Sequence, residues 1–317
     1  MDMQNIPKVE TADRLLDTAF RRGRDSAKLS KQKARGDRFN KQKTVELRKF
    51  AAARKSLVDS LERILKSFPS FDQLSDFYKE LVKCTLDYRL LKKSLGAVNW
   101  ARKQVDELHS VYAKRLKRAK YPDELGKIRG EFYGRISSVL KQVKNELAML
   151  EEARKIMRGY PLFKQDMFTV AIAGFPNVGK TTLLSKLTPA KPEIAAYPFT
   201  TKGINMGYAK SGSRIIQLVD TPGTLNRFDK MNNIEKQAYL VIKHLADAVV
   251  YVFDLTEPYP LSDQIKLYKN VERLKPGLLI YFSKADILEQ EVIDKFREKY
   301  PGFYDPEELK NHLFSRT

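Results

Sequence analysis

The feature that most constrains this chain is residues 174–181, which read GFPNVGKT and lie between the apolar run Phe168–Ala173 and the helical pattern Thr181–Leu187. Glycines let a loop wrap phosphates closely enough for several backbone N–H groups to point inward, and the start of the following helix adds partial positive charge. A glycine turn with a chance lysine is the alternative, but both flanks match the context that a P-loop requires. The segment therefore predicts a phosphate-binding loop within an α/β domain.

The chemistry of phosphate binding indicates a role for individual residues of this loop. Lys180 is expected to reach the β- and γ-phosphates, and the Thr181 hydroxyl is expected to ligate Mg²⁺. The predicted phosphate-binding residues are Gly174, Pro176, Asn177, Val178, Gly179, Lys180, Thr181 and Thr182.

Two further segments are expected to complete the phosphate site. The Asp220–Gly223 turn ends the strand pattern Arg214–Val219, where a carboxylate can hold Mg²⁺ through water and the Gly223 amide can sense a γ-phosphate. Upstream, Thr200 and Thr201 offer adjacent hydroxyls, one of which can complete the magnesium shell when a γ-phosphate is present. Periodicity alone does not separate the two, and we choose Thr201. The predicted catalytic residues are Lys180, Thr201 and Gly223, and the predicted magnesium ligands are Thr181, Thr201 and Asp220.

Base selection is expected from Ser283, Lys284 and Asp286, which follow the apolar run Leu278–Phe282. Asp286 can accept hydrogen bonds from the N1 and N2 donors of guanine, a pair that adenine lacks, and the Lys284 stem can lie over the ring. The usual guanine motif is Asn-Lys-x-Asp, so Ser283 replaces its Asn, and an ordinary strand-end turn is the alternative. We expect GTP and GDP as ligands, more weakly held than usual.

The chain divides into two chemically different halves. Residues 1–160 hold 38 Lys/Arg and 21 Asp/Glu, for a net +17, whereas residues 161–317 carry +3 of the total +20. Apolar spacing of three and four predicts antiparallel helices, and strand-like runs alternate with helix-length segments after residue 160. The expected helices are Thr44–Phe68, Phe71–Gly96, Ala97–Lys120 and Asp123–Tyr160, with Ser70 and Asp123 as N-caps. The predicted domains are thus a helical bundle, 1–160, with 1–43 partly disordered, and an α/β domain with a mostly parallel sheet, 161–317.

The positive charge predicts a polyanionic partner. Arg21–Lys55 holds fourteen Lys/Arg against three acidic residues, and Lys114–Lys120 is a second cluster. Such charged runs are ordinarily interpreted as a solvated face, but the unequal net charge of the two halves favours RNA binding. No apolar run is long enough to span a bilayer, and a membrane surface is not expected because Arg21–Lys43 lacks a wide apolar face. We expect Arg21–Gln42 to order only on its partner.

In this order, the four nucleotide-site elements resemble the Ras-like translation-factor class of GTPases, and Phe175–Val178 with Tyr197–Thr201 is similar to its Obg–HflX superfamily. Within that superfamily, the chain is most similar to the Nog branch, the nucleolar G protein family, and it resembles a short, archaeal-type member. The segments that carry it are Thr11–Phe20, Leu95–Arg102, Asn233–Ala238 and Leu245–Val249. The resemblance implies a helical domain before a P-loop GTPase domain, and a role in assembling the large ribosomal subunit through its RNA.

Two departures from the usual GTPase pattern bear on turnover and affinity. Thr224 stands where Ras-like proteins often carry a water-orienting glutamine, so slow hydrolysis is expected, and Asn177 matches the asparagine that helps hold K⁺ in potassium-using relatives. After Gly302, the chain runs into a helical pattern with Pro306 at its first position, so the C-terminal base loop is shortened or lost.

We therefore predict a monomeric GTP switch that uses Mg²⁺ and K⁺. Its expected partners are ribosomal RNA and the large-subunit precursor, with ribosomal proteins as further candidates, in the cytoplasm or, in a eukaryote, the nucleolus. A nucleotide-binding placeholder on RNA with little turnover, and a nucleotide-gated protein-binding module without RNA contact, stay open as alternatives.

Overall fold

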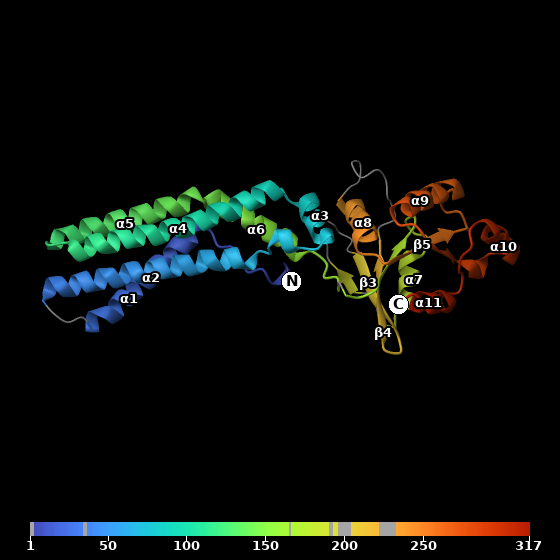
Figure 1. The fold of residues 1–317 in the computed structure, drawn as a ribbon, viewed down its shortest axis with the longest axis horizontal. Helices are drawn as coiled ribbons and strands as arrows, with labels where there is room; N and C mark the ends of the chain where they lie inside the picture. The colour runs from blue at the N-terminus through green and yellow to red at the C-terminus, as the bar shows by residue number, and fades with distance from the viewer. Residues whose placement is uncertain (1–2, 34–36, 165, 190–192, 196–203, 222–232) are drawn as a thin grey trace. The chain divides into compact units, whose positions relative to one another are not determined.

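The chain forms two compact units in the computed structural model (Figure 1). The structure describes residues 3–33, 37–164, 166–189, 193–195, 204–221 and 233–317. The first unit comprises Met1–Ser70 and Leu86–Arg158, and the second comprises Phe71–Thr85 and Gly159–Thr317. The sequence-based division at residue 160 placed Phe71–Thr85 with the helical half, whereas in the structure this segment packs within the second unit.

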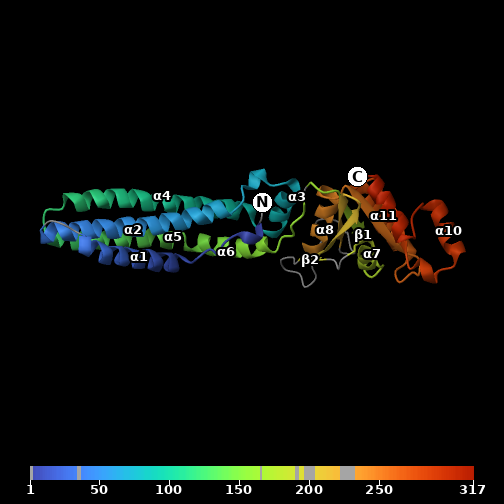
Figure 2. The same cartoon turned by 90° about the horizontal axis from the view of Figure 1, so that it is seen from below.

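The first unit is a bundle of long helices. Its helices are α1 (Ala12–Lys33), α2 (Arg38–Ser67), α4 (Tyr88–Arg118), α5 (Pro122–Gln142) and α6 (Lys144–Arg158), preceded by the short turn η1 (Met3–Asn5). In Figures 1 and 2, α2, α4 and α5 run side by side, and each pair is in contact. Phe50 of α2 stacks on Phe132 of α5 with ring centroids 3.9 Å apart, and both rings are fully buried. Burial of such apolar rings, rather than helix propensity, supplies most of the bundle's stability.

Several helix ends differ from the sequence-based expectation. The break expected at Gly96 is wrong, because α4 runs through it from an N-cap at Asp87, whose carboxylate accepts a hydrogen bond from Leu90 N at 2.9 Å. Gly96 is exposed and a Cβ there meets no atom within 4 Å, so it lowers only the local helix propensity. The expected N-caps are also wrong: Ser70 precedes the 3-10 turn Phe71–Gln73, and α5 begins one residue before Asp123, at Pro122.

Helix α1 differs from the expectation that Arg21–Gln42 orders only on a partner. Residues 21–33 lie in α1 and residues 38–42 begin α2, which packs against α1. Leu15, Ala19 and Ala27 give α1 a buried apolar stripe, and Phe20 meets Tyr133 of α5 edge-on at 4.6 Å. The apolar stripe is sparse among many cations, and this is why composition alone favoured disorder.

The second unit contains a six-stranded sheet with order β2-β3-β4-β1-β5-β6. β1 pairs in parallel with β4 and β5, and β5 pairs in parallel with β6, whereas β3 is antiparallel to both β2 and β4. Its strands are β1 (Thr169–Ala173), β2 (Glu193–Ala195), β3 (Ile204–Ser211), β4 (Arg214–Asp220), β5 (Ala248–Asp254) and β6 (Leu279–Ser283). The mostly parallel sheet is thus confirmed, with an antiparallel edge that the sequence reading lacked.

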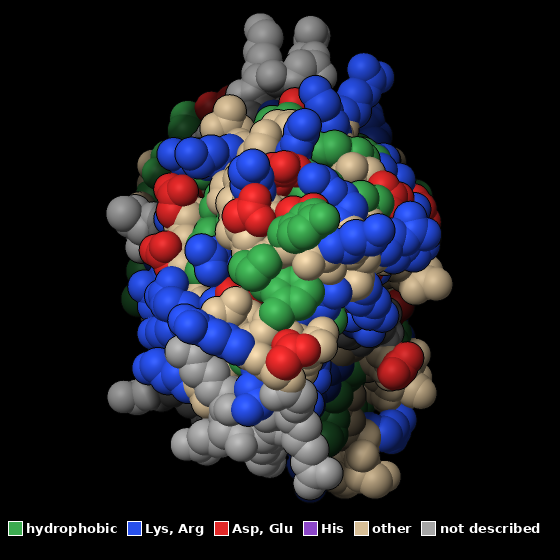
Figure 3. Space-filling model, turned by 90° about the vertical axis from the view of Figure 1, so that its left-hand side faces the viewer, with side chains coloured by type: hydrophobic (Ala, Val, Ile, Leu, Met, Phe, Trp, Pro, Cys, Tyr) green, Lys and Arg blue, Asp and Glu red, His purple; other side chains and the backbone are tan. Residues whose placement is uncertain are grey.

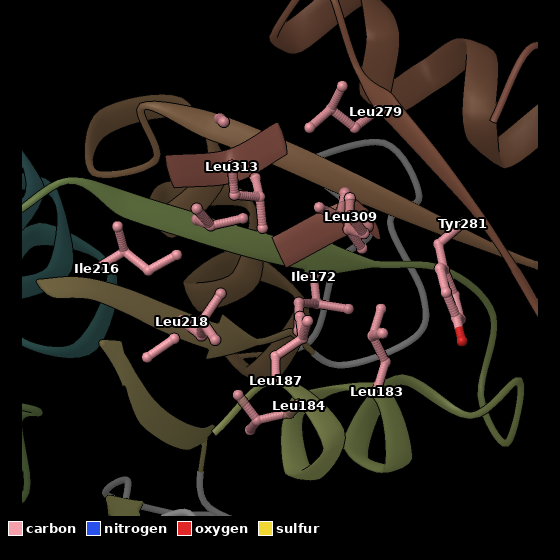
Figure 4. Close-up of a cluster of buried hydrophobic side chains, with 14 of the residues drawn as sticks. Ile172, Leu183, Leu184, Leu187, Ile216, Leu218, Leu279, Tyr281, Leu309 and Leu313 are labelled. Atoms are coloured by element: carbon pink, nitrogen blue, oxygen red, sulfur yellow. The ribbon is translucent and has the colours of Figure 1, made fainter. Parts of the chain in front are cut away.

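Both faces of this sheet carry packed side chains. On one face, side chains of β1, β4, β5 and β6 form a buried cluster with leucines of α7 (Lys180–Leu187) and α11 (Pro306–Ser315), as Figure 4 shows. On the other, Tyr251 and Phe253 of β5 meet rings of α9 (Leu261–Leu274) and α10 (Gln290–Lys299). Strands buried on both faces read as the continuous apolar runs seen in the sequence.

Helix α3 (Asp76–Thr85) joins this unit across a long stretch of sequence. It packs against α8 (Asn233–His244), and the Tyr78 hydroxyl donates to Pro161 O at 2.7 Å while it accepts from Phe163 N at 3.2 Å. Burial raises the pKa of the Tyr78 hydroxyl, which therefore stays protonated as a donor. Helix α3 thereby fixes the segment that leads into β1.

Candidate functional site

The P-loop lies between the end of β1 and the start of α7, and its backbone requires glycine at two positions. Gly174 has φ +148°, and a Cβ there lies 2.7 Å from the Val252 carbonyl oxygen. Gly179 has φ +90° at the N-cap of α7, and Asn177 is exposed in the left-handed region at φ +59°. Left-handed residues within a turn bring backbone N–H groups to one side, which is the arrangement that cradles an anion. Val178 is fully buried and holds the loop onto the domain core.

Lys180 is buried beneath this loop, with 7% of its surface exposed. Its ammonium donates to the Phe175 carbonyl oxygen at 2.5 Å, within the loop itself. Burial lowers the pKa of Lys180 to about 8, and the nearby Asp220 carboxylate opposes that shift. A desolvated cation held at the mouth of a loop attracts phosphate strongly, because the loop carbonyl and the nearby Asp220 carboxylate compensate its charge only in part.

A compact set of oxygens lies beside the loop. The Thr181 hydroxyl donates to Asp220 Oδ2 at 2.5 Å, and the Asn205 amide donates to the same oxygen at 3.2 Å. Asp220 is 8% exposed, and its buried Oδ1 has no hydrogen-bond partner among the residues that the structure describes. An unpartnered carboxylate oxygen next to a threonine hydroxyl fits the oxygen ligands that Mg²⁺ takes in nucleotide sites.

The predicted guanine motif is fastened to the end of β5. The Ser283 hydroxyl donates to Phe253 O at 3.1 Å, and a Cβ on Gly179 meets Ser283 Cβ at 3.4 Å, so Ser283 packs against the P-loop. Lys284, at φ +55°, pairs with Asp254 Oδ2 at 2.5 Å. Asp254 is fully buried, and its other oxygen accepts from the Thr256 backbone and hydroxyl.

Asp286 lies in the short turn η4 (Ala285–Ile287), where it is exposed and accessible to a base. Nearby, burial raises the pKa of the Tyr281 hydroxyl, and the Asp305 and Asp286 carboxylates add to the shift, so both charges face this hydroxyl. The backbone of Phe303 bonds to Ile280 and Phe282 of β6, and Asp305 then caps α11 through Glu307 N and Glu308 N. The helix predicted from Pro306 is confirmed, and only Tyr304 and Asp305 separate it from the Phe303 bridge.

The structure brings Lys180, Thr181 and Asp220 together beside the P-loop, and it places Ser283 against Gly179. Pro176 is half-buried within the loop and Thr182 is exposed on α7. Thr201 and Gly223 lie outside the described residues, so these two assignments stay predictions.

Sequence reasoning missed Asn205 and Asp254. Asn205 reaches Asp220 only because β3 pairs antiparallel with β4 in a register that sets the two residues opposite each other. Asp254 ends β5 opposite Ser283 in the parallel pairing with β6. A carboxylate at the end of a buried strand was the one available signal for Asp254, because parallel strand ends converge at ligand sites.

Several of the Lys and Arg side chains that were expected to bind a polyanionic partner are instead bonded to other groups within the first unit. Lys43 donates to Lys117 O and Ala119 O at the end of α4, both at 2.8 Å, and Arg54 pairs with Asp106. In the second cluster, Arg115 pairs with Glu131. No helix in the described part of the chain is sufficiently long and apolar to cross a membrane.

Comparison with known proteins adds family matches to these observations. Residues 3–163 match the model described as the NOG1 N-terminal helical domain, and residues 169–284 match the model described as 50S ribosome-binding GTPase. An uncharacterized protein of Methanocaldococcus jannaschii is 38% identical over 92% of this chain and 82% of its own length.

Nucleolar GTP-binding protein 1 of Kluyveromyces lactis is 29% identical over 94% of this chain and 47% of its own length, so the chain spans about half of that relative. The solved G domain of the T. maritima FeoB iron transporter is 25% identical over 47% of this chain and 98% of its own, with a TM-score of 0.40.

Proposed function

This chain belongs to the NOG1 family of GTPases, and from that premise we propose that it is a slow GTP-hydrolysing switch that acts in large ribosomal subunit assembly by binding ribosomal RNA. The observation that carries the proposal is the P-loop with Lys180 buried beneath it and the Thr181–Asp220 pair beside it. The matched models and relatives, described as ribosome-binding and nucleolar GTP-binding proteins, support the ribosomal partner.

Phosphate binding follows from the charges at this loop. On binding, the γ-phosphate offers Lys180 a stronger acceptor than the Phe175 carbonyl that it now holds, because a phosphate oxygen carries negative charge that a carbonyl lacks. Thr181 and Asp220 are the residues that hold Mg²⁺, which neutralises charge on the β- and γ-phosphates when bound. The residues Thr201 and Gly223 are proposed to sense the γ-phosphate and to give the switch its two states.

Guanine selection is assigned to Asp286, with Lys284 as the platform for the ring. Asp254 holds Lys284 by its ammonium, so the lysine stem is oriented before the base arrives. A binding competition among GTP, GDP and ATP tests this assignment: guanine nucleotides are expected to displace a labelled GTP analogue far better than ATP. A preference for ATP overturns the role of Asp286.

Slow hydrolysis follows from the absence of a glutamine at position 224, where the chain has Thr. We propose that K⁺ held near the exposed, left-handed Asn177 supplies charge stabilisation that this site otherwise lacks. Turnover in K⁺ is expected to exceed turnover in Na⁺, and Asn177→Ala is expected to abolish that difference. Equal rates in the two cations refute the potassium proposal.

RNA binding is assigned to the first unit because its residues, 1–70 and 86–158, carry a net +18 of the total formal charge of +20. Binding should weaken steeply with salt, since each phosphate contact releases counterions. Single-turnover GTP hydrolysis with and without large-subunit particles tests the switch. Acceleration by particles supports it, whereas no acceleration, together with retained function in Lys180→Ala, supports a nucleotide-binding placeholder.

A further inference from the structure

The first unit contains a pocket of about 680 Å³ where α2 and α5 begin. Arg38 and Pro122, the first residues of these two helices, both line it, so two helix N-termini meet at one cavity. Its apolar lining comes from Val45 and Leu125, which are buried. The volume lies within the range of about 300–1,000 Å³ that is typical of small-molecule and cofactor sites.

The rim of this pocket is cationic. Arg38, Lys41, Lys49 and Arg129 line it. Figure 3 looks onto this end of the unit, where Lys and Arg side chains, with several Asp and Glu among them, surround a smaller group of hydrophobic ones. Such a rim attracts an anion, and the aliphatic stems and apolar lining suit a flat ring.

Glu46 distinguishes this pocket from a simple anion site. It lines the pocket with only 7% of its surface exposed, and its Oε1 accepts from Lys49 at 2.6 Å and Arg129 at 3.2 Å. Its buried Oε2 has no hydrogen-bond partner among the described residues. A buried acceptor without a donor is costly, and a ligand N–H or O–H group removes that cost once the carboxylate turns toward the pocket, since Oε2 is shielded from solvent as it stands.

A ligand that satisfies all three features carries a phosphate, a flat apolar ring and hydrogen-bond donors on one edge. An inorganic anion lacks the donors and is repelled by the Glu46 carboxylate, whereas a guanine nucleotide offers N1–H and N2–H donors to it. Resting on the proposed RNA-binding function, we propose that this pocket receives one unpaired guanine nucleotide of the RNA partner, with phosphate at the cationic rim and the base edge toward Glu46. Unpaired nucleotides are the usual targets of sequence-specific RNA recognition.

Gly126 provides a direct way to fill the pocket. It lines the cavity from α5, it is exposed, and a Cβ there meets no atom within 4 Å, so Gly126→Phe occupies the space without a backbone clash. Gly134 lies on the same helix, is equally open and does not line the pocket. Gly134→Phe is therefore a matched control with the same added ring and the same gain in helix propensity.

The experiment measures the affinity of the whole chain for an RNA hairpin with one bulged guanine, for the same hairpin with a bulged cytosine, and for the fully paired hairpin. We expect the wild type and Gly134→Phe to prefer the bulged guanine by about tenfold, as one well-placed base contact gives. Gly126→Phe is expected to bind all three RNAs alike. Glu46→Gln, checked for folding by circular dichroism, is expected to lose the preference of guanine over cytosine.

The outcomes separate this inference from the function on which it rests. Equal affinity of the wild type for the three RNAs, with binding that falls steeply in salt, overturns the pocket assignment and leaves the RNA-binding function standing. A preference that survives in Gly126→Phe also overturns the pocket. Absence of salt-dependent binding to any of the RNAs overturns both.

Discussion

Raising the pH should stabilise the nucleotide-free protein through Lys180. Burial lowers the pKa of this lysine in the folded state to about 8 from an ordinary value of 10.5. Between these two values, the unfolded chain still binds a proton that the folded chain has released. The free energy of unfolding therefore rises with pH in this window, because stability increases wherever the unfolded state binds more protons.

The size of the effect follows from the same two pKa values. From pH 8 to pH 10, this single group contributes a gain of about 2 kcal/mol. Other groups also titrate in this range; burial raises the pKa of the Cys84 thiol, for example, which acts in the opposite direction. The comparison must therefore be made with Lys180→Met, which keeps a long side chain but lacks the titrating ammonium, so that the contributions of other groups cancel.

The assay is urea unfolding in EDTA at pH 8 and pH 10, followed by far-UV circular dichroism. Trp100 is the only tryptophan and lies in α4, so its emission reports the first unit separately from the second. The free energy of unfolding of the wild type should increase relative to that of Lys180→Met as the pH rises. A stability difference that stays constant to within about 0.5 kcal/mol refutes the burial argument. With Mg²⁺ and GTP bound, the phosphates hold the lysine charged, and the gain should disappear.

Three further substitutions test other contacts of the site. Asp254→Asn removes the charge that holds Lys284 and should weaken GTP binding by about tenfold while leaving the GTP-to-ATP affinity ratio unchanged, as measured by competition. Asp220→Asn should abolish the tightening of nucleotide binding by Mg²⁺, which calorimetry with and without EDTA measures; retained Mg²⁺ dependence excludes this carboxylate as a ligand. Gly174→Ala places a methyl 2.7 Å from a β5 carbonyl and should lower the free energy of unfolding by more than about 2 kcal/mol, and a neutral result contradicts the close approach.

Local patterns predicted the elements whose cause is local. The runs that became β1, β4, β5 and β6 were visible because both of their faces are buried, and the P-loop was visible because its glycines are required by backbone geometry. The antiparallel edge was missed because β3, Ile204–Ser211, pairs with β4 on one side and mixes polar with apolar residues. The false break at Gly96 came from treating a helical glycine as a terminator, when burial on either side of it carries α4 through.

Site residues could be predicted where they belong to a sequence motif, but not where the pairing of neighbouring strands places them. Thr181 and Asp220 were assigned to one metal from separate motifs, and the structure brings them into contact. Asp254 and Asn205 act through the register of neighbouring strands, which one sequence does not display.

The placement of α3 has a consequence for synthesis of the protein. The chain passes from the first unit to the second at residue 71, returns at residue 86 and leaves again at residue 159. Helix α3 is therefore translated long before α8, against which it packs. At about 5–20 residues per second, roughly 8–30 s separate the two. Phe77, Tyr78 and Leu81 are buried in the finished protein, but α8 is missing during that interval, so the nascent chain presents an apolar helix face that a chaperone can hold until the G domain is complete.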